Sequence, residues 1–483
     1  MKRACLLGLV FSLVLTGCYR LRPSSGGGQT KIDEARWINA EDVALPAGYR
    51  IRAVATGLTF PTGATFDSEG RLYVVESGYS YGEVWTTPRL LKIEENGRAT
   101  EIAKGSTNGP WTGVAFHDGN FFVAEGGTME GGKILKITPE GEVTSIVDGL
   151  PSFGDHHTDG PAVSRDGWIY FGQGTASNSG VIGEDNAKFG WLKRKPRFHD
   201  IPGEDIVLAG ENFTSKDALK EGGGRAVTGA FVPFGESTRP NQVISGQIKC
   251  SGGIMRVRPD GSDLQLVAWG FRNPFGLGFA PDGSLFVTDN AFDERGSRPI
   301  WGTADVLWRV EQGKWYGWPD YSAGEPVTLK KFKPPGKPQA KFVLAKHPSR
   351  PPAPVVRFGV HSSADGLDFS RSENFGYVGQ AFVALFGDQA PAVGKTLHPV
   401  GFKVVRVDVE RGTIADFAVN EGKKNGPASK IGSGGLERPV SVEFSPEGDA
   451  LYVVDFGVMM QDKEGSKPQQ GTGVIWRITK EGK

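Results

Sequence analysis

The feature that most constrains this chain is an internal repeat. One unit recurs six times: a short apolar strand, a turn with glycine, a strongly apolar second strand, a variable loop and a third strand. The second strands are 72–75, 121–124, 168–171, 285–288, 382–385 and 451–454, and the third strands are 90–93, 134–137, 254–257, 307–310, 404–407 and 475–478. Short strands without helical periodicity predict an all-β, six-bladed β-propeller. A β-sandwich, the alternative, does not predict the same unit six times.

The two ends of the repeat predict how the ring closes. The last unit stops at its third strand, 475–478, and an unassigned strand, 49–54, precedes the first unit. If strand 49–54 forms the outer edge of the sixth blade, the ring closes and an exposed sheet edge is removed. We therefore expect a single propeller domain over residues 46–483, closed by an N-terminal strand.

Loop lengths predict where the binding face lies. The long segments fall between the second and third strands of the units, and they are 77–89, 175–252, 290–305, 387–400 and 456–473. The alternating direction of the strands places all of them on one face, together with the starts of the first strands. Insertions gathered on one face of a rigid scaffold are typical of a binding face.

The N-terminus predicts export and a lipid anchor. The chain starts with basic residues, and an apolar stretch follows at 6–15. This stretch is too short for a permanent membrane helix, so the two features together indicate a cleaved signal peptide over 1–17. The sequence Leu-Thr-Gly-Cys ending at Cys18 is similar to the bacterial lipobox, which predicts lipidation of Cys18 and a tether over 18–45. An ordinary secretory signal with a chance cysteine is the alternative. Tyr19 stands where inner-membrane retention would show Asp, so we expect an outer-membrane lipoprotein facing the periplasm or the cell surface.

Charge and cysteine content exclude two functional classes. The chain has 55 Lys and Arg against 55 Asp and Glu, a formal net charge of +0, whereas a nucleic-acid-binding surface shows a basic excess. Cys5 lies in the predicted signal peptide and Cys18 is the predicted lipidation site, so only Cys250 remains in the folded part of the chain. The sequence contains no Cys-x-x-Cys-His motif, which excludes a covalently attached c-type haem. Any electrons that the protein extracts must therefore leave through an external acceptor.

Two segments at the starts of first strands could carry catalysis. In Gly-Asp-His-His-Thr-Asp-Gly at 154–160, His156 could take a proton from a hydroxyl, and Asp155 could fix its tautomer and raise its basicity. At 270–276, Arg272 could stabilise an oxyanion or a quinone oxygen, and Asn273 could orient one. Taken alone, a His-His pair is more often structural, and an Arg-Asn-Pro segment is more often a strand cap.

A loop after the fourth unit's second strand could bind a cation. Clustered carboxylates and carbonyl oxygens at 289–296, beginning with Asp289 and Asn290, suit Ca²⁺, which takes six to eight oxygen ligands. The spacing is not that of an EF-hand loop. A loop held by salt bridges to Arg295 and Arg298 is the alternative.

Together these elements resemble the soluble quinoprotein glucose/sorbosone dehydrogenase family. The resemblance spans about 57–478, and its motifs are 271–277 (FRNPFGL), 281–283 (PDG), 289–290 (DN) and 315–319 (WYGWP). It implies a six-bladed propeller that uses pyrroloquinoline quinone (PQQ) and Ca²⁺.

The resemblance also implies roles for particular residues. His156 falls at the position of the family's base, beside Asp155, and Arg272 and Asn273 fall on the substrate and quinone contacts. The carbonyl groups that bind the cofactor's calcium fall on Ala291 and Phe292, where Gly-Pro would be typical. The fifth blade lacks the family's basic pattern for the quinone carboxylates, and the available basic residues there are Lys395, Lys403 and Arg406.

We therefore expect PQQ-dependent oxidation of a sugar or related alcohol, with the electrons passed to an external acceptor. A propeller hydrolase of the lactonase type, which would use a metal-bound water, is one alternative. A non-catalytic propeller that binds a glycan or a protein is the other. The sequence does not identify the sugar, because specificity would lie in the long loops, above all 175–252.

Overall fold

The computed structural model describes residues 27, 35–78, 84–462 and 465–481. The predicted signal peptide, 1–17, and Cys18 lie outside the described residues, as does most of the predicted tether up to residue 34. Within the described part of the chain, no helix is both long and apolar enough to cross a membrane.

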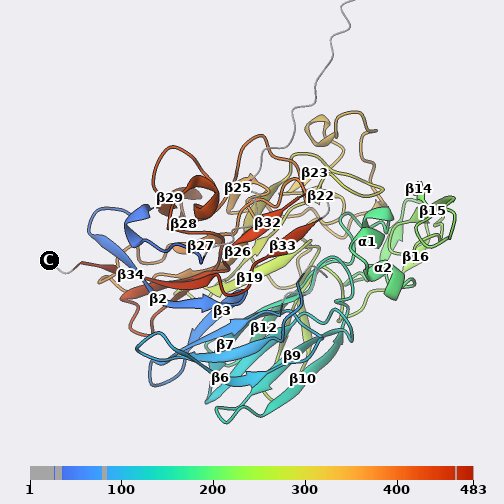
Figure 1. Ribbon diagram of the computed structural model, residues 1–483. Helices are drawn as coiled ribbons and strands as arrows, with labels where there is room; N and C mark the ends of the chain where they lie inside the picture. Colours follow the sequence, from blue (N-terminus) through green and yellow to red (C-terminus); the bar gives the residue numbers. More distant parts are fainter. Residues whose placement is uncertain (1–26, 28–34, 79–83, 463–464, 482–483) are drawn as a thin grey trace, which may run out of the picture.

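Antiparallel β-sheets make up the body of the molecule (Figure 1). Six of the sheets formed by the described residues have four or five strands. The first three, each given from its first strand, are β3 (Pro61–Phe66), β4 (Leu72–Glu76), β5 (Arg89–Ile93), β6 (Ala99–Lys104); β7 (Trp111–His117), β8 (Asn120–Glu125), β9 (Gly132–Ile137), β10 (Val143–Leu150); and β11 (Thr158–Val163), β12 (Ile169–Gln173), β17 (Gly253–Val257), β18 (Gln265–Trp269). The prediction of an all-β protein built on a strand repeat is confirmed.

The other three sheets follow the same order. They are β19 (Pro274–Phe279), β20 (Leu285–Asp289), β21 (Ala304–Arg309), β25 (Val356–Val360); β26 (Ala364–Phe369), β27 (Ala381–Leu385), β28 (Lys403–Asp408), β29 (Thr413–Asn420), β1 (Val43–Ala44); and β30 (Pro439–Phe444), β31 (Ala450–Asp455), β34 (Gly473–Lys480), β2 (Tyr49–Leu58). β2 contains the unassigned segment 49–54 and pairs with β34, with Ile51 opposite Ile478. The N-terminal strand is therefore the outer strand of the sixth sheet.

The first strands of the six sheets lie next to one another. β3 contacts β7, and the contacts continue through β11, β19 and β26 to β30, which contacts β3 again. Apolar side chains fill the space between neighbouring sheets: Val75 and Leu90 of the first pack with Phe121 and Val123 of the second. Burying these faces removes apolar surface from water, which is the main force that holds the sheets together.

Glycine permits the close approach of the first strands. A Cβ atom added to Gly113 in β7 would lie 2.3 Å from the carbonyl oxygen of Gly160 in β11. One added to Gly276 in β19 would lie 2.3 Å from the carbonyl oxygen of Asp365 in β26. Both distances are shorter than van der Waals contact, so any side chain here would push neighbouring strands apart.

The insertion at 175–252 folds into a small subdomain at one side of the molecule (Figure 1). Its elements are α1 (Glu184–Lys188), α2 (Trp191–Arg194), β13 (Ile206–Leu208), β14 (Asn212–Lys216), β15 (Arg225–Gly229) and β16 (Val243–Ile244). A second long segment follows the third strand of the fourth sheet, between β21 and β25. It carries β22 (Tyr321–Ser322), β23 (Glu325–Pro326), η2 (Lys330–Phe332) and β24 (Leu344–Lys346). β24 pairs with β13, so the two insertions share one apolar core.

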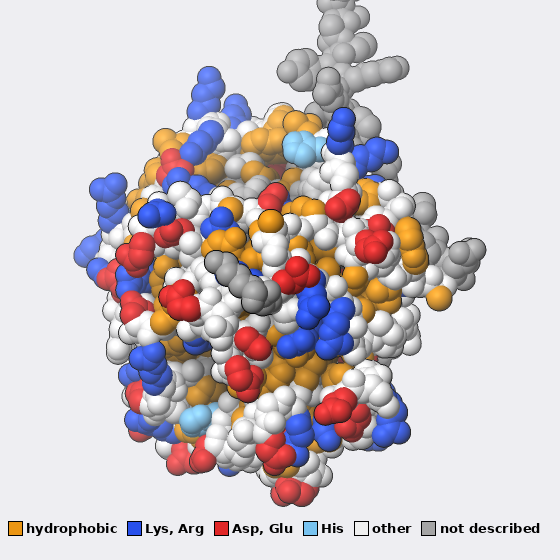
Figure 2. Space-filling model, turned by 90° about the vertical axis from the view of Figure 1, so that its left-hand side faces the viewer, with side chains coloured by type: hydrophobic (Ala, Val, Ile, Leu, Met, Phe, Trp, Pro, Cys, Tyr) orange, Lys and Arg blue, Asp and Glu red, His pale blue; other side chains and the backbone are white. Residues whose placement is uncertain are grey.

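Short elements complete the described chain. They are η1 (Ala40–Asp42), α3 (Ala428–Ile431), and the paired strands β32 (Met459–Gln461) and β33 (Ser466–Pro468). On the face in Figure 2, acidic and basic side chains are interspersed, in keeping with the net charge of +0. The domain limit at residue 46 stays a prediction.

We predict that Gly276→Ala lowers the free energy of unfolding by about 1–3 kcal/mol, the usual cost of overpacking. Gly278→Ala, two residues along the same strand, is the matched control because its Cβ would lie 3.0 Å from Leu367 Cδ1 and 3.1 Å from the Leu367 carbonyl oxygen, a looser approach that shifts of a few tenths of an ångström relieve. Urea unfolding of both variants checks this. Equal losses would contradict the role given to close strand approach.

Candidate functional site

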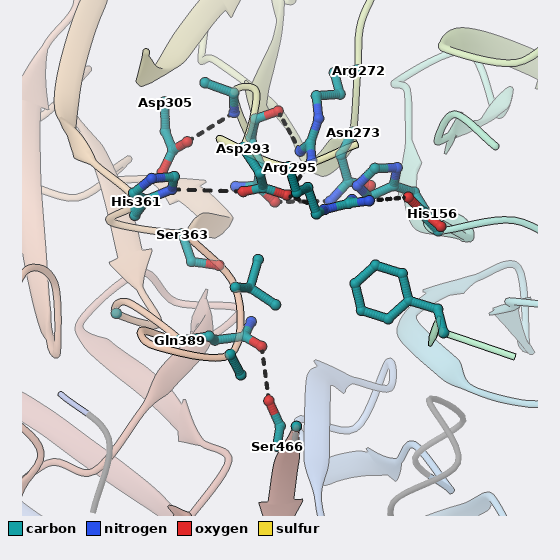
Figure 3. Close-up of a pocket in the computed structure, with 18 of the residues that line it drawn as sticks. His156, Arg272, Asn273, Asp293, Arg295, Asp305, His361, Ser363, Gln389 and Ser466 are labelled. Atoms are coloured by element: carbon teal, nitrogen blue, oxygen red, sulfur yellow. Dashed lines mark hydrogen bonds and ion pairs between the residues drawn. The ribbon is translucent and has the colours of Figure 1, made fainter. Parts of the chain in front are cut away.

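A cavity of about 590 Å³ opens where the long loops meet the starts of the first strands. Figure 3 shows His156, Asn273 and Arg272 along one side of it, with Gln389 and Ser466 across from them. His156 precedes β11, Arg272 and Asn273 precede β19, and Gln389 and Ser466 come from loops of the fifth and sixth sheets. The face that loop lengths predicted as the binding face therefore holds the cavity.

His156 is a neutral imidazole with a defined tautomer. Its Nδ1 lies 2.9 Å from the carbonyl oxygen of Thr175. Because a carbonyl only accepts, Nδ1 carries the hydrogen and Nε2 keeps its lone pair. Burial, followed by the charges of Arg272 and Arg295, lowers the pKa of His156 well below its ordinary value of 6.5. The ring can therefore accept a proton at neutral pH through Nε2.

Asp155 does not have the role that the sequence predicted for it. Its carboxylate accepts hydrogen bonds from Trp191 Nε1 at 2.7 Å and Asn186 Nδ2 at 2.9 Å, and pairs with Arg295 Nη1 at 2.6 Å. Thr175 sets the tautomer of His156 instead, and the pKa of His156 is lowered rather than raised. The physical reason is that an arginine and two residues of the insertion attract the carboxylate.

His157 lies on the other side of the strand start. The ring is buried and is not among the described residues that line the cavity. Burial lowers the pKa of His157 to about 4, while hydrogen bonds from the ring to the backbone of Ser152 and Gly126 and the charge of Asp155 act against it. Consecutive residues entering a strand point to opposite sides, which explains why only His156 reaches the cavity.

Arg272 and Asn273 are positioned by Asp289 at the end of β20. The Asp289 Oδ1 atom accepts the backbone N–H groups of Asn273 at 2.8 Å and Arg272 at 3.1 Å, and its Oδ2 accepts Trp308 Nε1 at 3.3 Å. Burial raises the pKa of Asp289 to about 6. Asp289 is thus a structural acceptor, not the cavity-facing calcium ligand that the sequence predicted. Arg272 in turn places its Nη2 2.7 Å from Asp293 Oδ2.

Asn273 keeps one unused acceptor. Its Nδ2 donates to Asn290 Oδ1 at 2.8 Å. Its Oδ1 is buried and accepts no hydrogen bond from the described residues. An ideal Cβ on Gly174 would meet both this oxygen and the Cβ of His156, so Asn273 Oδ1 lies beside the histidine. A buried acceptor without a donor carries a desolvation cost that a bound ligand can offset.

The predicted calcium loop is only partly turned toward the cavity. Asn290 and Ala291 line the cavity, whereas Phe292 does not belong to the described lining. The carbonyl oxygen of Phe292 accepts the Thr303 hydroxyl at 2.8 Å, and its ring is buried in the core shared by the insertions. The Ala291 N–H donates to Asp305 Oδ1 at 2.8 Å, which fixes the loop. Of the two predicted carbonyl ligands, Ala291 is the one at the cavity.

The three basic residues predicted to hold quinone carboxylates do not line the cavity within the described chain. Lys403 pairs with Asp416 at 2.6 Å across β28 and β29, and Arg406 donates to Gln380 and covers the ring of Tyr377. Lys395 is exposed on the loop between β27 and β28. Strand register directs Arg406 into contacts with its own sheet, which corrects the prediction for this set.

His361 supplies a cation that the sequence reasoning missed. It precedes β26 and lines the cavity, with Nε2 3.0 Å from Glu294 and Nδ1 3.7 Å from Asp293. Burial disfavours its charged form, yet the hydrogen bond and charge of Glu294 raise the pKa of His361 to about 9. His361 precedes the first strand of the fifth sheet, as His156 and Arg272 precede first strands of theirs. This position in the repeat is the sequence signal that could have identified it as a site residue.

The residues present fit a flat, polyanionic quinone. The cavity holds His361 and Arg272 as cations, Asn273 Oδ1 as a buried acceptor without a donor, and His156 as a neutral base. Of the three aspartates in the described lining, Asp155 and Asp293 are paired with arginine. Burial alone would raise the pKa of Asp293, but the charges of Arg272 and Arg295 outweigh it and hold this pKa below its ordinary value. For calcium, Ala291 is the predicted carbonyl ligand that lines the cavity. The oxygens of the neighbouring Asn290 accept hydrogen bonds from Asn273 and Arg272, and the described residues contain no group of three or more His, Cys, Asp or Glu side chains placed to hold a metal ion.

The sequence matches no protein-family model and no curated protein. Solved structures share its fold. The holo PQQ domain of a pyranose dehydrogenase from Coprinopsis cinerea is 16% identical over 95% of this chain and 100% of that chain, with a TM-score of 0.55.

Two further structures have the same fold. The calcium structure of a carbohydrate-active enzyme of family AA12 from Trichoderma reesei is 15% identical over 93% of this chain and 99% of that chain, with a TM-score of 0.54. The PQQ-bound aldose sugar dehydrogenase from Streptomyces coelicolor is 17% identical over 90% of this chain and 99% of that chain, with a TM-score of 0.50. The chain therefore shares the β-propeller fold of these three structures.

Proposed function

We propose that this protein is a PQQ- and Ca²⁺-dependent dehydrogenase that oxidises a sugar or a related alcohol or aldehyde. The six sheets would be the blades of a six-bladed propeller closed by β2. One observation carries the proposal: His156 is neutral, its Nδ1 is committed to Thr175, and it lines the cavity together with Arg272 and Asn273. Solved structures of this fold that contain PQQ or calcium support it.

The residues of the chain account for the proton and for orientation. His156 Nε2 takes the proton of the substrate hydroxyl, and that hydroxyl oxygen becomes a carbonyl oxygen. PQQ, when bound, would supply the two-electron acceptor for the hydrogen on the same carbon. Arg272 offers positive charge at the developing oxyanion, and Asn273 fixes the orientation of the bound groups. An external acceptor then takes the electrons.

Two alternative functions are tested by the experiments below. A lactonase-type hydrolase would need carboxylates free to hold a metal, whereas Asp155 and Asp293 are each paired with arginine at 3.0 Å or less. A non-catalytic propeller that binds a glycan or protein would need no base, and it gives no reason for the single neutral tautomer of His156.

We predict that His156→Asn lowers kcat by about 10²–10⁴-fold, the usual contribution of a general base. His157→Asn is the matched control and should lose much less activity, because that ring lies outside the cavity lining.

Because the pKa of His156 is lowered, the acidic limb of kcat/KM in the wild type should lie below pH 6.5. The assay is dye reduction with a sugar panel after loading with PQQ and Ca²⁺. Wild-type activity in His156→Asn, or an acidic limb above pH 6.5, would contradict the assignment.

Calcium removal should weaken quinone binding. We predict that exhaustive chelation lowers the affinity for PQQ at least tenfold and that added Ca²⁺ restores this affinity. The absorbance of the bound quinone measures the binding. Asp305→Asn, which weakens the carboxylate that holds the Ala291 N–H, should lower the same affinity, whereas Asp282→Asn in an exposed turn should not. Unchanged PQQ affinity after chelation would remove the calcium assignment. Failure of the wild type to bind PQQ would favour the hydrolase or binding-module alternatives.

We also propose an outer-membrane lipoprotein that faces the periplasm or the cell surface, anchored through Cys18. The proposal is supported by the basic start, the apolar stretch 6–15 and the lipobox-like segment before Cys18. Cys18→Ala should move the protein from the membrane fraction to the soluble fraction. Cys5→Ala, within the signal segment, is the matched control and should leave fractionation unchanged. Membrane association that survives Cys18→Ala would refute the anchor.

A further inference from the structure

A second hollow adjoins the catalytic cavity. It has a volume of about 520 Å³ and lies between α1, α2 and the hairpin of β14 and β15. Lys188 at the end of α1 lines both this hollow and the cavity. The two spaces therefore adjoin at Lys188, and the hollow belongs to the insertion at 175–252.

The hollow is strongly cationic. Its four lysines, Lys188, Lys193, Lys216 and Lys220, are all exposed and come from three separate elements. Among the described residues, Lys193, Lys216 and Lys220 form no ion pair. Asp217, one of the two acidic residues in the lining, turns its carboxylate to the backbone N–H groups of Leu219 and Lys220, both at 3.1 Å. A chain with a net charge of +0 thus places three lysines, for which no ion pair is found among the described residues, beside the cavity.

We propose that this lysine hollow binds the anionic units of an acidic oligosaccharide whose reducing-end sugar enters the cavity beside His156. The inference rests on the proposed function and specifies its substrate class. Carboxylate groups along the sugar chain would meet the ammonium groups in turn. Lysine suits such a ligand because its flexible point charge does not demand one planar geometry.

Shape favours a sugar chain over an acidic protein partner. The lysines lie in a concave hollow between a helix pair and a hairpin, whereas protein partners meet a broad patch of about 800 Å² on each side. Phe189, directly after Lys188, lines the cavity, and the guanidinium of Arg295 covers one face of its ring at 4.7 Å. An aromatic face beside polar groups is a common way to bind an amphipathic ligand such as a sugar.

Binding of oligogalacturonate and kinetics with it test the inference. The variant Lys216→Gln/Lys220→Gln removes two charges from the hairpin, outside the catalytic cavity. The matched control is Lys423→Gln/Lys424→Gln, an exposed pair that lines neither space. Titration calorimetry on the protein without cofactor compares tetragalacturonate with neutral maltotetraose. Kinetics on the PQQ- and Ca²⁺-loaded protein compare the same two sugars.

We expect the Lys216→Gln/Lys220→Gln variant to bind tetragalacturonate about five- to tenfold more weakly, which is the loss that two exposed ion pairs can cause. The KM for tetragalacturonate should rise by the same factor, and kcat for this sugar should stay unchanged. Added salt should weaken wild-type binding in the same way. Maltotetraose and the control variant should show no change. Equal affinity of the wild type for both sugars, or equal loss in the control variant, would overturn the inference.

The two proposals fail separately. Oxidation of neutral aldoses with no preference for the acidic sugar would sink the substrate class and leave the dehydrogenase standing. Binding of tetragalacturonate that depends on Lys216 and Lys220, in a protein that oxidises no sugar, would support the hollow as a glycan site and refute the dehydrogenase. Binding of a purified acidic protein through the same lysines, without binding of the sugar, would also overturn the inference.

Discussion

The guanidinium of Arg295 joins three segments that are far apart in the sequence. It pairs with Asp155 before β11, with Asp185 in α1, and with Asp293 in the loop after β20. These ion pairs are largely removed from water, so each carboxylate depends on the arginine for compensation of its charge. The arginine also lies close enough to His156 to lower the pKa of that ring. One side chain therefore fixes the insertion against the cavity and, after burial and the charge of Arg272, adds to the lowering of the pKa of His156.

The scaffold supplies the other half of the site through a repeated contact. Asp289 accepts the N–H groups at the start of the fourth sheet and the indole N–H of Trp308. Asp455 does the same at the start of the sixth sheet, with the indole of Trp476. The backbone of Arg272 is thus held by an aspartate–tryptophan hydrogen-bond arrangement that two of the sheets share, and only the Arg272 side chain is specific to the cavity.

Two imidazoles in one cavity take opposite charge states because their neighbours differ. His156 is buried near two arginines and remains neutral, whereas His361 lies against Glu294 and Asp293 and is cationic, with a pKa raised to about 9. A neutral base and a separate cation in one cavity would suit the proposed removal of a proton from a substrate beside an anionic cofactor. The insertion adds the lysine hollow beside the cavity, so the proposed recognition and the proposed chemistry would be carried by different parts of the fold.

The sequence by itself determined the strands, their sixfold order and the residues at the starts of first strands, because alternation and turns are local signals. His156 and Arg272 were found in this way. The tertiary structure alone decided which groups meet: it turned Asp155 toward Arg295, Asp289 toward the backbone, and Arg406 away from the cavity. It also brought in His361. These partners lie 17, 26 and 140 residues away in the sequence and belong to other strands or loops. Because the fold decides which segments meet, and burial together with neighbouring charges sets the protonation of a side chain, neither can be read from a local pattern.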